Sequence, residues 1–239
     1  MEGSFTRCAA FYAYPYAGGG KTSFAGWDKK LTPYVQLVTV ELSGRDARTY
    51  EPLYETLHDC VEDICRWIRM RMREDSFAIY GHSMGALLGY EVAHRLHTEG
   101  LSPLHLIVSG REAPQLVNAD RKAIHKLPDR ELIDHVVGLG GTPPEIFEYP
   151  ELTKLVLHRL RSDFKIIETS HFAERNSKLP CPITVLYGES EGIAEVDARA
   201  WAVHTSAYCS VRRFPGDHFF IYSQEDSVLS FVLRSLLHK

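Results

Sequence analysis

The sequence predicts an α/β protein in which a mostly parallel sheet is covered by helices on both faces. Short apolar runs rich in strand-forming residues alternate with segments of helical period, which is typical of a parallel sheet. One stretch breaks this alternation, because residues 114–177 contain helical patterns and no convincing strand. A glycine-flanked serine at Gly81–Gly85 joins a strand directly to a helix. With 239 residues the chain fits one domain, so we predict a single domain over 1–239 with a helical insertion at 114–177.

Six runs have the length and apolar character of buried strands. In a parallel sheet both faces are covered, so such strands are apolar throughout rather than alternating. Consecutive strands are joined by right-handed crossovers, which place helices on both faces. The six runs are Cys8–Tyr14, Val35–Glu41, Phe77–Tyr80, Leu104–Ser109, Ile183–Tyr187 and Ser210–Phe214.

Three segments outside the insertion have helical period. The first carries apolar residues spaced three or four apart, which places them on one helix face. The second follows the serine turn over Ala86–Leu96 and is stopped by Gly100. The third opens with Ser223-Gln224-Glu225-Asp226, a Ser-x-x-Asp pattern that predicts an N-cap at Ser223. The apolar positions are Leu57, Val61, Ile64, Ile68 and Met72, then Leu88, Val92 and Leu96, then Val228, Val232 and Leu236.

The insertion contains two predicted helices separated by a break at Gly140–Pro144. The first covers Arg130–Val137, and the second is longer and amphipathic. An all-helical insertion between two strands is where such folds carry a lid over the active site, and we predict that role here. The alternative is a packed structural subdomain with no substrate role. The apolar stripe of the longer helix is Leu152, Val156, Leu160, Phe164 and Ile167.

Composition and charge exclude several classes of partner. The net charge of −4 gives no reason to expect nucleic acid or an anionic membrane, and the arginines at 66, 69, 71 and 73 are interspersed with acids, as on a solvated helix face. The apolar start at Cys8–Tyr16 is broken by Pro15, and no stretch reaches the length of a membrane span. The five cysteines are scattered without a Cys-x-x-Cys pair, which indicates free buried thiols. We therefore expect a cytoplasmic, soluble protein.

The turn Gly81-His82-Ser83-Met84-Gly85 is the strongest functional signal. A Gly-x-Ser-x-Gly motif alone is weak evidence, but here it follows an apolar strand and runs straight into a helix. That context is typical of the nucleophile elbow of the α/β-hydrolase fold, where a strained turn exposes the serine hydroxyl above the sheet. We predict Ser83 as the nucleophile; the alternative is a tight glycine-rich turn with an incidental serine.

A serine hydroxyl needs a base, and the chain order of this fold places the acid and then the histidine after the insertion. Of the 12 histidines, His218 is the best placed, in a loop between the last predicted strand and the last helix. His82 neighbours the serine, but successive residues of the turn point apart, so we expect a structural role for it. We predict His218 as the base.

The carboxylate that orients the base should follow the strand ending at Tyr187. Glu191 and Asp197 are the main contenders and Glu189 is the third. Asp197 fits the first turn of a helix, where an acid is explained by the helix dipole. We therefore predict Glu191.

The oxyanion hole requires two backbone N–H groups. Met84 supplies one, and the loop Pro15–Gly20 after the first strand supplies the other, which we assign to Ala17. The sequence Gly20-Lys21-Thr22 resembles the end of a phosphate-binding P-loop, but the glycine that this motif requires five positions before Gly20 is replaced by Pro15.

The whole chain resembles the type II (external, editing) thioesterases that accompany polyketide synthases and nonribosomal peptide synthetases. The motifs that carry the resemblance are spread over most of the chain. They are Pro15-Tyr16-Ala17-Gly18-Gly19, Ser43-Gly44-Arg45, Gly81-His82-Ser83-Met84-Gly85, Ser109-Gly110-Arg111-Glu112-Ala113-Pro114, Leu139-Gly140-Gly141-Thr142-Pro143, Arg161-Ser162-Asp163-Phe164 and His218-Phe219-Phe220.

This resemblance implies hydrolysis of acyl thioesters on the phosphopantetheine arm of carrier proteins or domains, with no metal or redox cofactor of the enzyme's own. Two positions depart from the family pattern. Glu191 stands where the family usually has aspartate, and Asp217 stands where it tends to have glycine before the histidine. Asp217 either tunes His218 electrostatically or faces solvent.

Three other functions remain open at this point. A carboxylesterase or lipase would use the same triad on oxygen esters. A product-releasing thioesterase would act on the same carriers with larger acyl groups. A non-catalytic carrier-binding protein could keep the fold without the chemistry.

Overall fold

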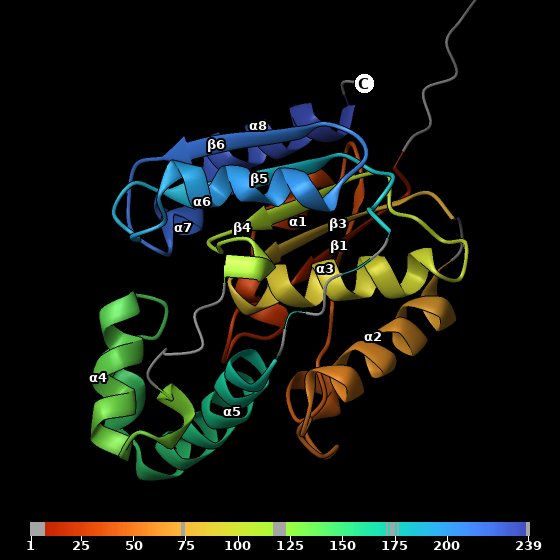
Figure 1. Ribbon diagram of the computed structural model, residues 1–239. Helices are drawn as coiled ribbons and strands as arrows, with labels where there is room; N and C mark the ends of the chain where they lie inside the picture. Colours follow the sequence, from red (N-terminus) through yellow and green to blue (C-terminus); the bar gives the residue numbers. More distant parts are fainter. Residues whose placement is uncertain are drawn as a thin grey trace, which may run out of the picture.

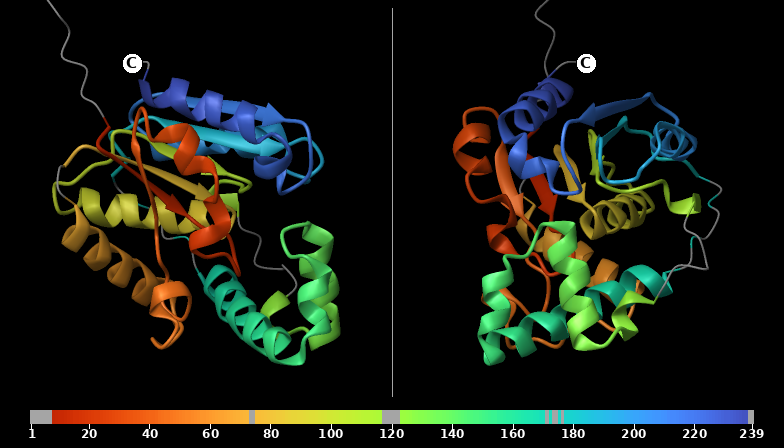
Figure 2. Two further views of the ribbon diagram at one scale, coloured as in Figure 1. Left: turned by 180° about the vertical axis from the view of Figure 1, so that it is seen from behind. Right: turned by 90° about the vertical axis from the view of Figure 1, so that its left-hand side faces the viewer.

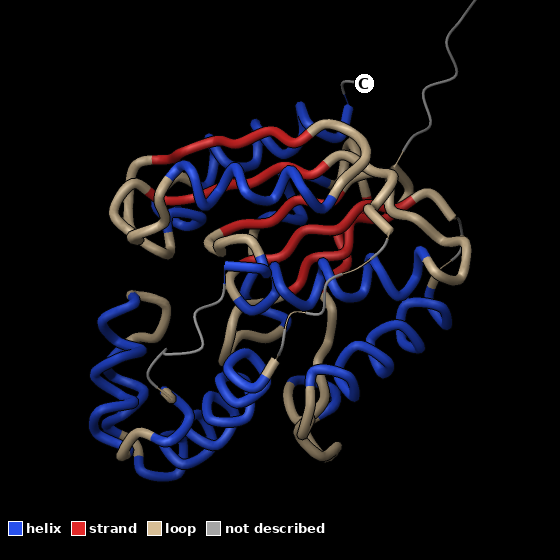
Figure 3. The backbone as a smooth tube through the Cα atoms, viewed as in Figure 1, coloured by secondary structure: helices blue, strands red, loops and turns tan. Residues whose placement is uncertain are grey.

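Six parallel strands form one sheet through the middle of the molecule (Figure 1, Figure 3). The computed structural model describes residues 8–72, 75–116, 123–170, 172, 175 and 177–237. The strand order is β2-β1-β3-β4-β5-β6, and every neighbouring pair is parallel. Each of the six predicted strands is confirmed. The strands are β1 (Ala10–Tyr14), β2 (Gln36–Thr39), β3 (Phe77–His82), β4 (Leu106–Ser109), β5 (Ile183–Gly188) and β6 (Cys209–Phe214).

Helices cover both faces of the sheet, as a parallel sheet requires (Figure 2). Successive residues of β1 point to opposite faces, so Tyr12 packs in one core and Phe11 in the other. The core around Tyr12 is covered by α2 (Leu57–Arg71), α3 (Met84–His97) and α6 (Glu195–Arg199). The core around Phe11 is covered by α1 (Trp27–Leu31), α7 (Phe220–Ser223) and α8 (Glu225–Leu237). The chain therefore has the α/β-hydrolase architecture that the sequence predicts.

The start of the last helix differs from the prediction. Ser223 is the last residue of α7, and its hydroxyl donates to the Phe220 carbonyl rather than capping α8. The first intrahelical bond at this end of α8 runs from the Val228 N–H to the Gln224 carbonyl. The predicted cap at Ser223 is wrong because the short helix α7 already occupies those residues.

The insertion between β4 and β5 is helical over its described residues. It contains α4 (Asp129–Leu139) and α5 (Pro150–Thr169), with the 3₁₀ turns η3 (Pro114–Leu116), η4 (Ile124–Lys126) and η5 (Pro144–Glu148). Within the predicted range 114–177, residues 117–122, 171, 173, 174 and 176 lie outside the described part of the chain. The two long helices stand beside the carboxyl ends of the strands (Figure 1, Figure 2). They share a small core of Leu127, Leu132, Val136, Leu157 and Leu160.

The buried face of α5 differs in part from the predicted apolar stripe. Leu152 is 47% exposed, whereas Asp163, a residue that the stripe omits, is among the buried residues of the helix. The rest of the stripe is confirmed, because Leu160 is buried and Val156 and Phe164 pack against the small core of the insertion. Hydrophobic periodicity cannot detect the buried carboxylate of Asp163.

The arginines of α2 form the solvated helix face that the sequence predicts. Arg69 pairs with Glu99, and the Arg71 guanidinium lies 4.1 Å from the centre of the Trp67 ring. Arg73 lies outside the described residues. All five cysteines are free, and four of them are buried. None of the described helices has the length and apolar character needed to cross a bilayer.

Candidate active site

Ser83 lies on the turn between β3 and α3 with a strained backbone. Its φ of 56° and ψ of −113° are unfavourable for a residue with a side chain. The flanking glycines are required sterically. A Cβ on Gly81 would lie 2.0 Å from the Gly85 carbonyl oxygen, and a Cβ on Gly85 would lie 2.0 Å from the Tyr14 carbonyl oxygen. The predicted strand-turn-helix geometry around Ser83 is therefore present.

The loop after β6 brings His218 against Glu191 from the loop after β5. The His218 Nδ1 lies 2.8 Å from the Glu191 Oε2, and the Glu191 side chain is only 1% exposed. The other carboxylate oxygen, Oε1, accepts the Gly188 N–H at 2.6 Å. Glycine at position 188 allows the loops after β5 and β6 to pack closely. A Cβ there would lie only 2.3 Å from the Asp217 carbonyl oxygen. Both carboxylate oxygens are thus fixed, and one of them orients the imidazole.

The two competing acids have other positions. Asp197 lies in the first turn of α6, as its sequence context suggested. Glu189 is partly exposed and pairs with Arg213 at 3.2 Å. Asp217 is exposed, and its Oδ1 accepts the Phe219 N–H at 2.8 Å. Of the described carboxylates, Glu191 is therefore the one that contacts His218, while Asp217 stabilises the turn into α7.

Ser83 and His218 line one small cavity of about 40 Å³. Tyr16, Ala17 and Phe219 complete its wall on the side of the sheet. The rest of the lining comes from the insertion, namely Val136, Leu139, Gly141, Thr142, Leu160 and Phe164. The turn after α4 fits closely, since a Cβ on Gly141 would lie 2.0 Å from the Phe219 ring. The insertion therefore covers the nucleophile and its base.

His82 is fully buried beside the base and has no exposed ring atom to offer a substrate. Its Nδ1 lies 3.0 Å from the Ser109 Oγ, and its ring centre lies 4.9 Å from that of His218. Burial, and secondarily the charge of His218, hold the pKa of His82 well below its ordinary value. His82 is therefore a neutral packing residue, as the sequence suggested.

Gly110, directly after β4, sits against both imidazoles. A Cβ there would lie 2.6 Å from the His82 Cε1 and 3.2 Å from the His218 Cε1, and its φ of +62° also favours glycine. The Gly110 N–H donates to the Leu186 carbonyl of β5 at 2.9 Å. This glycine lets the two histidines approach each other across β4.

The loop after β1 packs against the amino end of α3. Ala17 lines the cavity with Ser83, and Met84 is the first residue of α3, where backbone N–H groups have no intrahelical acceptor. Within the loop, the Gly19 N–H donates to the Tyr16 carbonyl at 2.9 Å. The two residues predicted for the oxyanion hole therefore flank the nucleophile from different segments.

The P-loop alternative is contradicted by the structure. Residues Lys21–Phe24 form a four-residue 3₁₀ turn rather than the long helix that follows a phosphate-binding loop. The Lys21 N–H donates to the Asp46 Oδ2 at 2.6 Å, so this amide already has an anionic partner.

A buried ion pair next to this loop was not predicted. Arg45 and Asp163 make two hydrogen bonds of 2.8 and 2.9 Å, and each side chain is 2% exposed. Burial would lower the pKa of Arg45, but the charge and hydrogen bonds of Asp163 raise it above its ordinary value. Both residues belong to motifs of the resemblance, but they are 118 positions apart, and no local pattern relates them.

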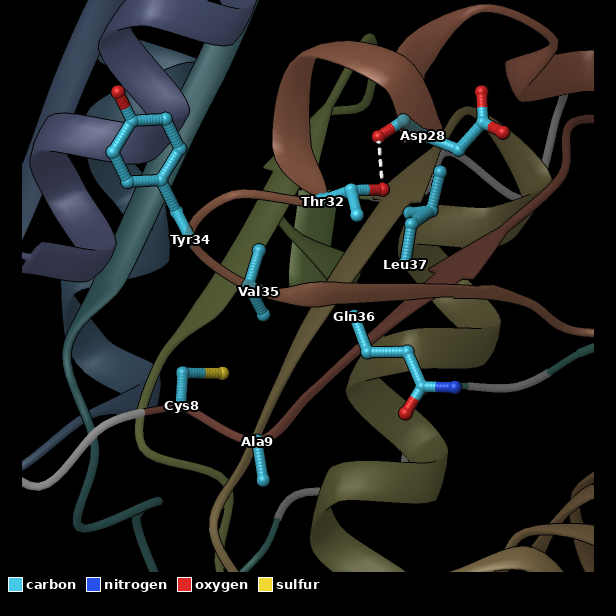
Figure 4. Close-up of a pocket in the computed structure, with 8 residues that line it drawn as sticks. All are labelled: Cys8, Ala9, Asp28, Thr32, Tyr34, Val35, Gln36 and Leu37. Atoms are coloured by element: carbon cyan, nitrogen blue, oxygen red, sulfur yellow. Dashed lines mark hydrogen bonds between the residues drawn. The ribbon is translucent and has the colours of Figure 1, made fainter.

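The cavity at Ser83 is smaller than a cavity at the opposite edge of the sheet, so size alone does not identify the active site. A cavity of about 380 Å³ opens at the starts of β1 and β2, beside α1 (Figure 4). In a parallel sheet the starts of the strands lie at the edge opposite to Ser83. Its lining is Cys8, Ala9, Asp28, Thr32, Tyr34, Val35, Gln36 and Leu37, and it includes none of the predicted site residues.

Comparison with known proteins agrees with this geometry. The family model described as "Thioesterase domain" matches residues 10–236. The chain belongs to this family. This thioesterase is 33% identical to the gramicidin S biosynthesis protein GrsT of Aneurinibacillus migulanus, over 94% of the chain and 88% of the relative.

Two solved structures resemble this thioesterase over almost all of their length. ClbQ from the colibactin NRPS/PKS pathway superimposes with a TM-score of 0.89 at 28% identity, covering 95% of this chain and 96% of ClbQ. The type II thioesterase BorB from the borrelidin biosynthetic cluster superimposes with a TM-score of 0.86 at 31% identity, covering 96% of this chain and 93% of BorB. The chain is thus a serine hydrolase of the α/β-hydrolase fold that acts on thioesters.

Proposed function

We propose that this thioesterase removes acyl groups from the phosphopantetheine arm of carrier proteins or domains of a polyketide or nonribosomal peptide pathway. Its role would be to edit stalled or misprimed acyl chains. The observation that carries the chemistry is the buried Glu191–His218 pair, which shares one loop cluster with Ser83. The carrier as partner is supported by the pathways named for GrsT, ClbQ and BorB.

The first half of the proposed mechanism forms an acyl-enzyme. Glu191 accepts a hydrogen bond from the His218 Nδ1, which leaves Nε2 free to take the proton of the Ser83 hydroxyl. The serine oxygen attacks the thioester carbonyl, and the N–H groups of Ala17 and Met84 stabilise the resulting oxyanion. The carbon–sulfur bond then breaks, and the sulfur leaves as the pantetheine thiol, taking the proton that His218 held, so that His218 is again neutral.

The second half repeats these steps with water. His218 takes a proton from a water molecule, whose oxygen attacks the acyl-serine carbonyl. The oxyanion again binds Ala17 and Met84, and the Ser83 oxygen leaves with the proton returned by His218. Each proton comes from Ser83 or water and is carried by His218, and backbone N–H groups stabilise the oxyanion, so we propose that the enzyme needs no metal or redox cofactor of its own.

We propose that the insertion acts as a lid. Its residues already supply more than half of the cavity lining, and the cavity of about 40 Å³ is too small to admit a pantetheine arm as it stands. The covering turn would therefore move to admit substrate. Val136, Leu139, Leu160 and Phe164 would then contact the acyl group.

Replacing the nucleophile tests the central claim. We expect Ser83→Ala to abolish hydrolysis of an acyl-carrier thioester and labelling by a fluorophosphonate probe, while circular dichroism shows an unchanged fold. Ser206→Ala, at an exposed serine just before the start of β6 and outside the cavity lining, is the matched control and should keep full activity. Wild-type turnover by Ser83→Ala would refute the mechanism.

Substrate comparison separates the remaining alternatives. A carrier-editing enzyme should hydrolyse an acyl-carrier thioester faster than the matching free oxygen ester, whereas a carboxylesterase would show the reverse. Preference for a full-length product chain over a short acyl group would indicate product release. Absence of fluorophosphonate labelling in the wild type would indicate a non-catalytic carrier-binding protein.

A further inference from the structure

The buried pair formed by Arg45 and Asp163 makes its remaining hydrogen bonds to the loop that carries Ala17. The Asp163 Oδ2 accepts the Gly18 N–H at 2.7 Å, in addition to its bond from Arg45. The Arg45 Nη1 also donates to the Gly19 carbonyl at 2.9 Å. One carboxylate and one guanidinium therefore hold two consecutive residues of this loop.

These bonds fix the peptide units on both sides of Ala17. The C=O and N–H of a trans peptide point in opposite directions. Because the Tyr16 carbonyl accepts the Gly19 N–H, the Ala17 N–H of the same peptide unit points the other way. The next peptide unit is fixed by the bond from the Gly18 N–H to Asp163. The orientation of the Ala17 N–H thus depends on two hydrogen bonds, and Arg45 and Asp163 hold the residues that make both.

The pair is hard to explain by stability alone. Taking two charges out of water is costly, and replacing a buried ion pair by apolar residues of similar size is often neutral or stabilising. Here, both side chains are 2% exposed, and the hydrogen bonds that they make beyond the pair go to the backbone of one loop. An apolar pair could not orient that backbone, because it could neither donate nor accept these hydrogen bonds.

Asp163 also connects this loop to the helix that lines the substrate cavity. It lies on α5 one turn from Leu160 and next to Phe164, both of which line the cavity. Residues three and four apart share one helix face, so this single face contacts both the loop and the acyl site. The α5 helix also contacts the loop before α2. The Ser162 hydroxyl donates to the Tyr54 carbonyl at 3.0 Å, and Lys165 pairs with the exposed Glu55 at 2.6 Å.

We propose that Arg45 and Asp163 are positioning residues, which hold the Ala17 N–H in the orientation that binds the oxyanion. This inference rests on the proposed function, because it takes Ala17 as an oxyanion donor. The α5 helix, which carries Asp163, is therefore a support of the site.

The test is the double variant Arg45→Met with Asp163→Leu, which removes both charges and keeps the volume apolar. Loss of one oxyanion-hole donor lowers kcat by about 10²–10³-fold, and we expect about 100-fold for a misoriented donor. KM should change less than about threefold, because the ground-state thioester does not need the oxyanion bond. Lys165→Met is the matched control, since it removes a surface ion pair between α5 and Glu55 that does not touch the loop of Ala17, and its kcat should remain at the wild-type value.

An alkyl trifluoromethyl ketone gives a second readout, because its adduct with Ser83 carries an oxyanion. Its Ki should rise in the double variant by the same factor by which kcat/KM falls. A purely structural role would lower the active fraction and leave Ki and KM of the remaining enzyme unchanged. Unchanged kcat and Ki in the folded double variant would overturn the proposal.

If the double variant does not fold, Arg45→Lys carries the test. It preserves the charge that Asp163 needs but cannot form two parallel bonds to the carboxylate and a third to Gly19. We expect a fall in kcat of about tenfold with KM unchanged; wild-type kcat would overturn the proposal. Wild-type activity on p-nitrophenyl acetate without activity on acyl-carrier thioesters would contradict the proposed substrate and leave this test intact.

Discussion

Glu191→Gln should be the most damaging conservative change in the site, because the new amide is forced into the wrong orientation. The Glu191 Oε1 accepts the Gly188 N–H at 2.6 Å, and the Oε2 accepts from the His218 Nδ1 at 2.8 Å. In the variant, the Gly188 N–H selects the amide oxygen, which turns the NH₂ group toward His218. The imidazole must then accept at Nδ1 and carry its proton on Nε2, so it cannot accept the proton of Ser83.

The expected loss follows from this tautomer change. An acid-to-amide change that selects the wrong tautomer lowers kcat about 10⁴-fold in a Ser-His-acid triad. This corresponds to about 5 kcal/mol at 1.36 kcal/mol for each factor of ten. The Glu191 side chain is 1% exposed, so solvent cannot relieve the misplaced donor. KM should change little, because the acid does not touch substrate.

The assay compares kcat and KM for a short acyl thioester in the wild type, Glu191→Gln and Asp197→Asn. Asp197→Asn should stay within about twofold of wild type, as is usual for a substitution away from the site. Glu191→Asp keeps the charge but is one methylene shorter, so it should lie between wild type and Glu191→Gln. A larger loss from Asp197→Asn than from Glu191→Gln would refute the assignment of the acid.

Three further outcomes are expected. Burial lowers the pKa of His105 to about 4, so the unfolded chain gains a proton below pH 6.5 that the folded chain does not, and stability falls as the pH drops from 6.5 toward 4. In denaturant titrations this group should lower the free energy of unfolding by about 1.4 kcal/mol for each unit by which the pH falls, and His105→Gln should remove that part of the pH dependence. The same pH dependence in the variant would contradict the role of His105. Gly85→Ala places a methyl group 2.0 Å from the Tyr14 carbonyl oxygen and should cost about 3 kcal/mol or more of unfolding free energy. Gly138→Ala, in open space on α4, should instead stabilise by about 0.5–1 kcal/mol, and similar losses in both would contradict the steric argument. Phe219→Ala enlarges the cavity and should raise kcat/KM for octanoyl relative to acetyl thioesters. The gain in binding free energy should not exceed about 0.8 kcal/mol for each methylene that the enlarged cavity buries. A constant ratio would show that Phe219 does not limit chain length.

The parts of the site that depend on local sequence were predictable. Ser83 lies on a strand-turn-helix segment whose glycines are adjacent in sequence, so its geometry is encoded within a few residues. The position of His218 follows from the order of elements in the fold. A helix start explains an acid at position 197, which favours Glu191 as the partner of His218, and the structure places Asp197 in that helix turn.

The parts that depend on distant contacts were not predictable. Asp163 is buried although it lies outside the predicted apolar stripe of its helix, and only the folded chain shows that Arg45 compensates its charge. The cap predicted at Ser223 is wrong for a local reason instead. The short helix α7, whose N-cap is Phe219, already includes Ser223, and the capping pattern alone does not show where the preceding helix ends. Short-range patterns therefore predicted elements and reactive groups, while pairing across the fold required three dimensions.

Substitution of Gly110 would disturb the active site although this residue takes no part in the reaction. The strand β4 lies between β3, which leads to Ser83, and β5, which leads to Glu191. Gly110 follows β4, and a Cβ at that position would crowd both the His82 and the His218 imidazole. Any larger residue there would separate the base from its neighbours while leaving every reacting atom in the chain. The site can therefore lose its geometry through a position that takes no part in proton transfer, and a redesign of this enzyme should treat the end of β4 as invariant.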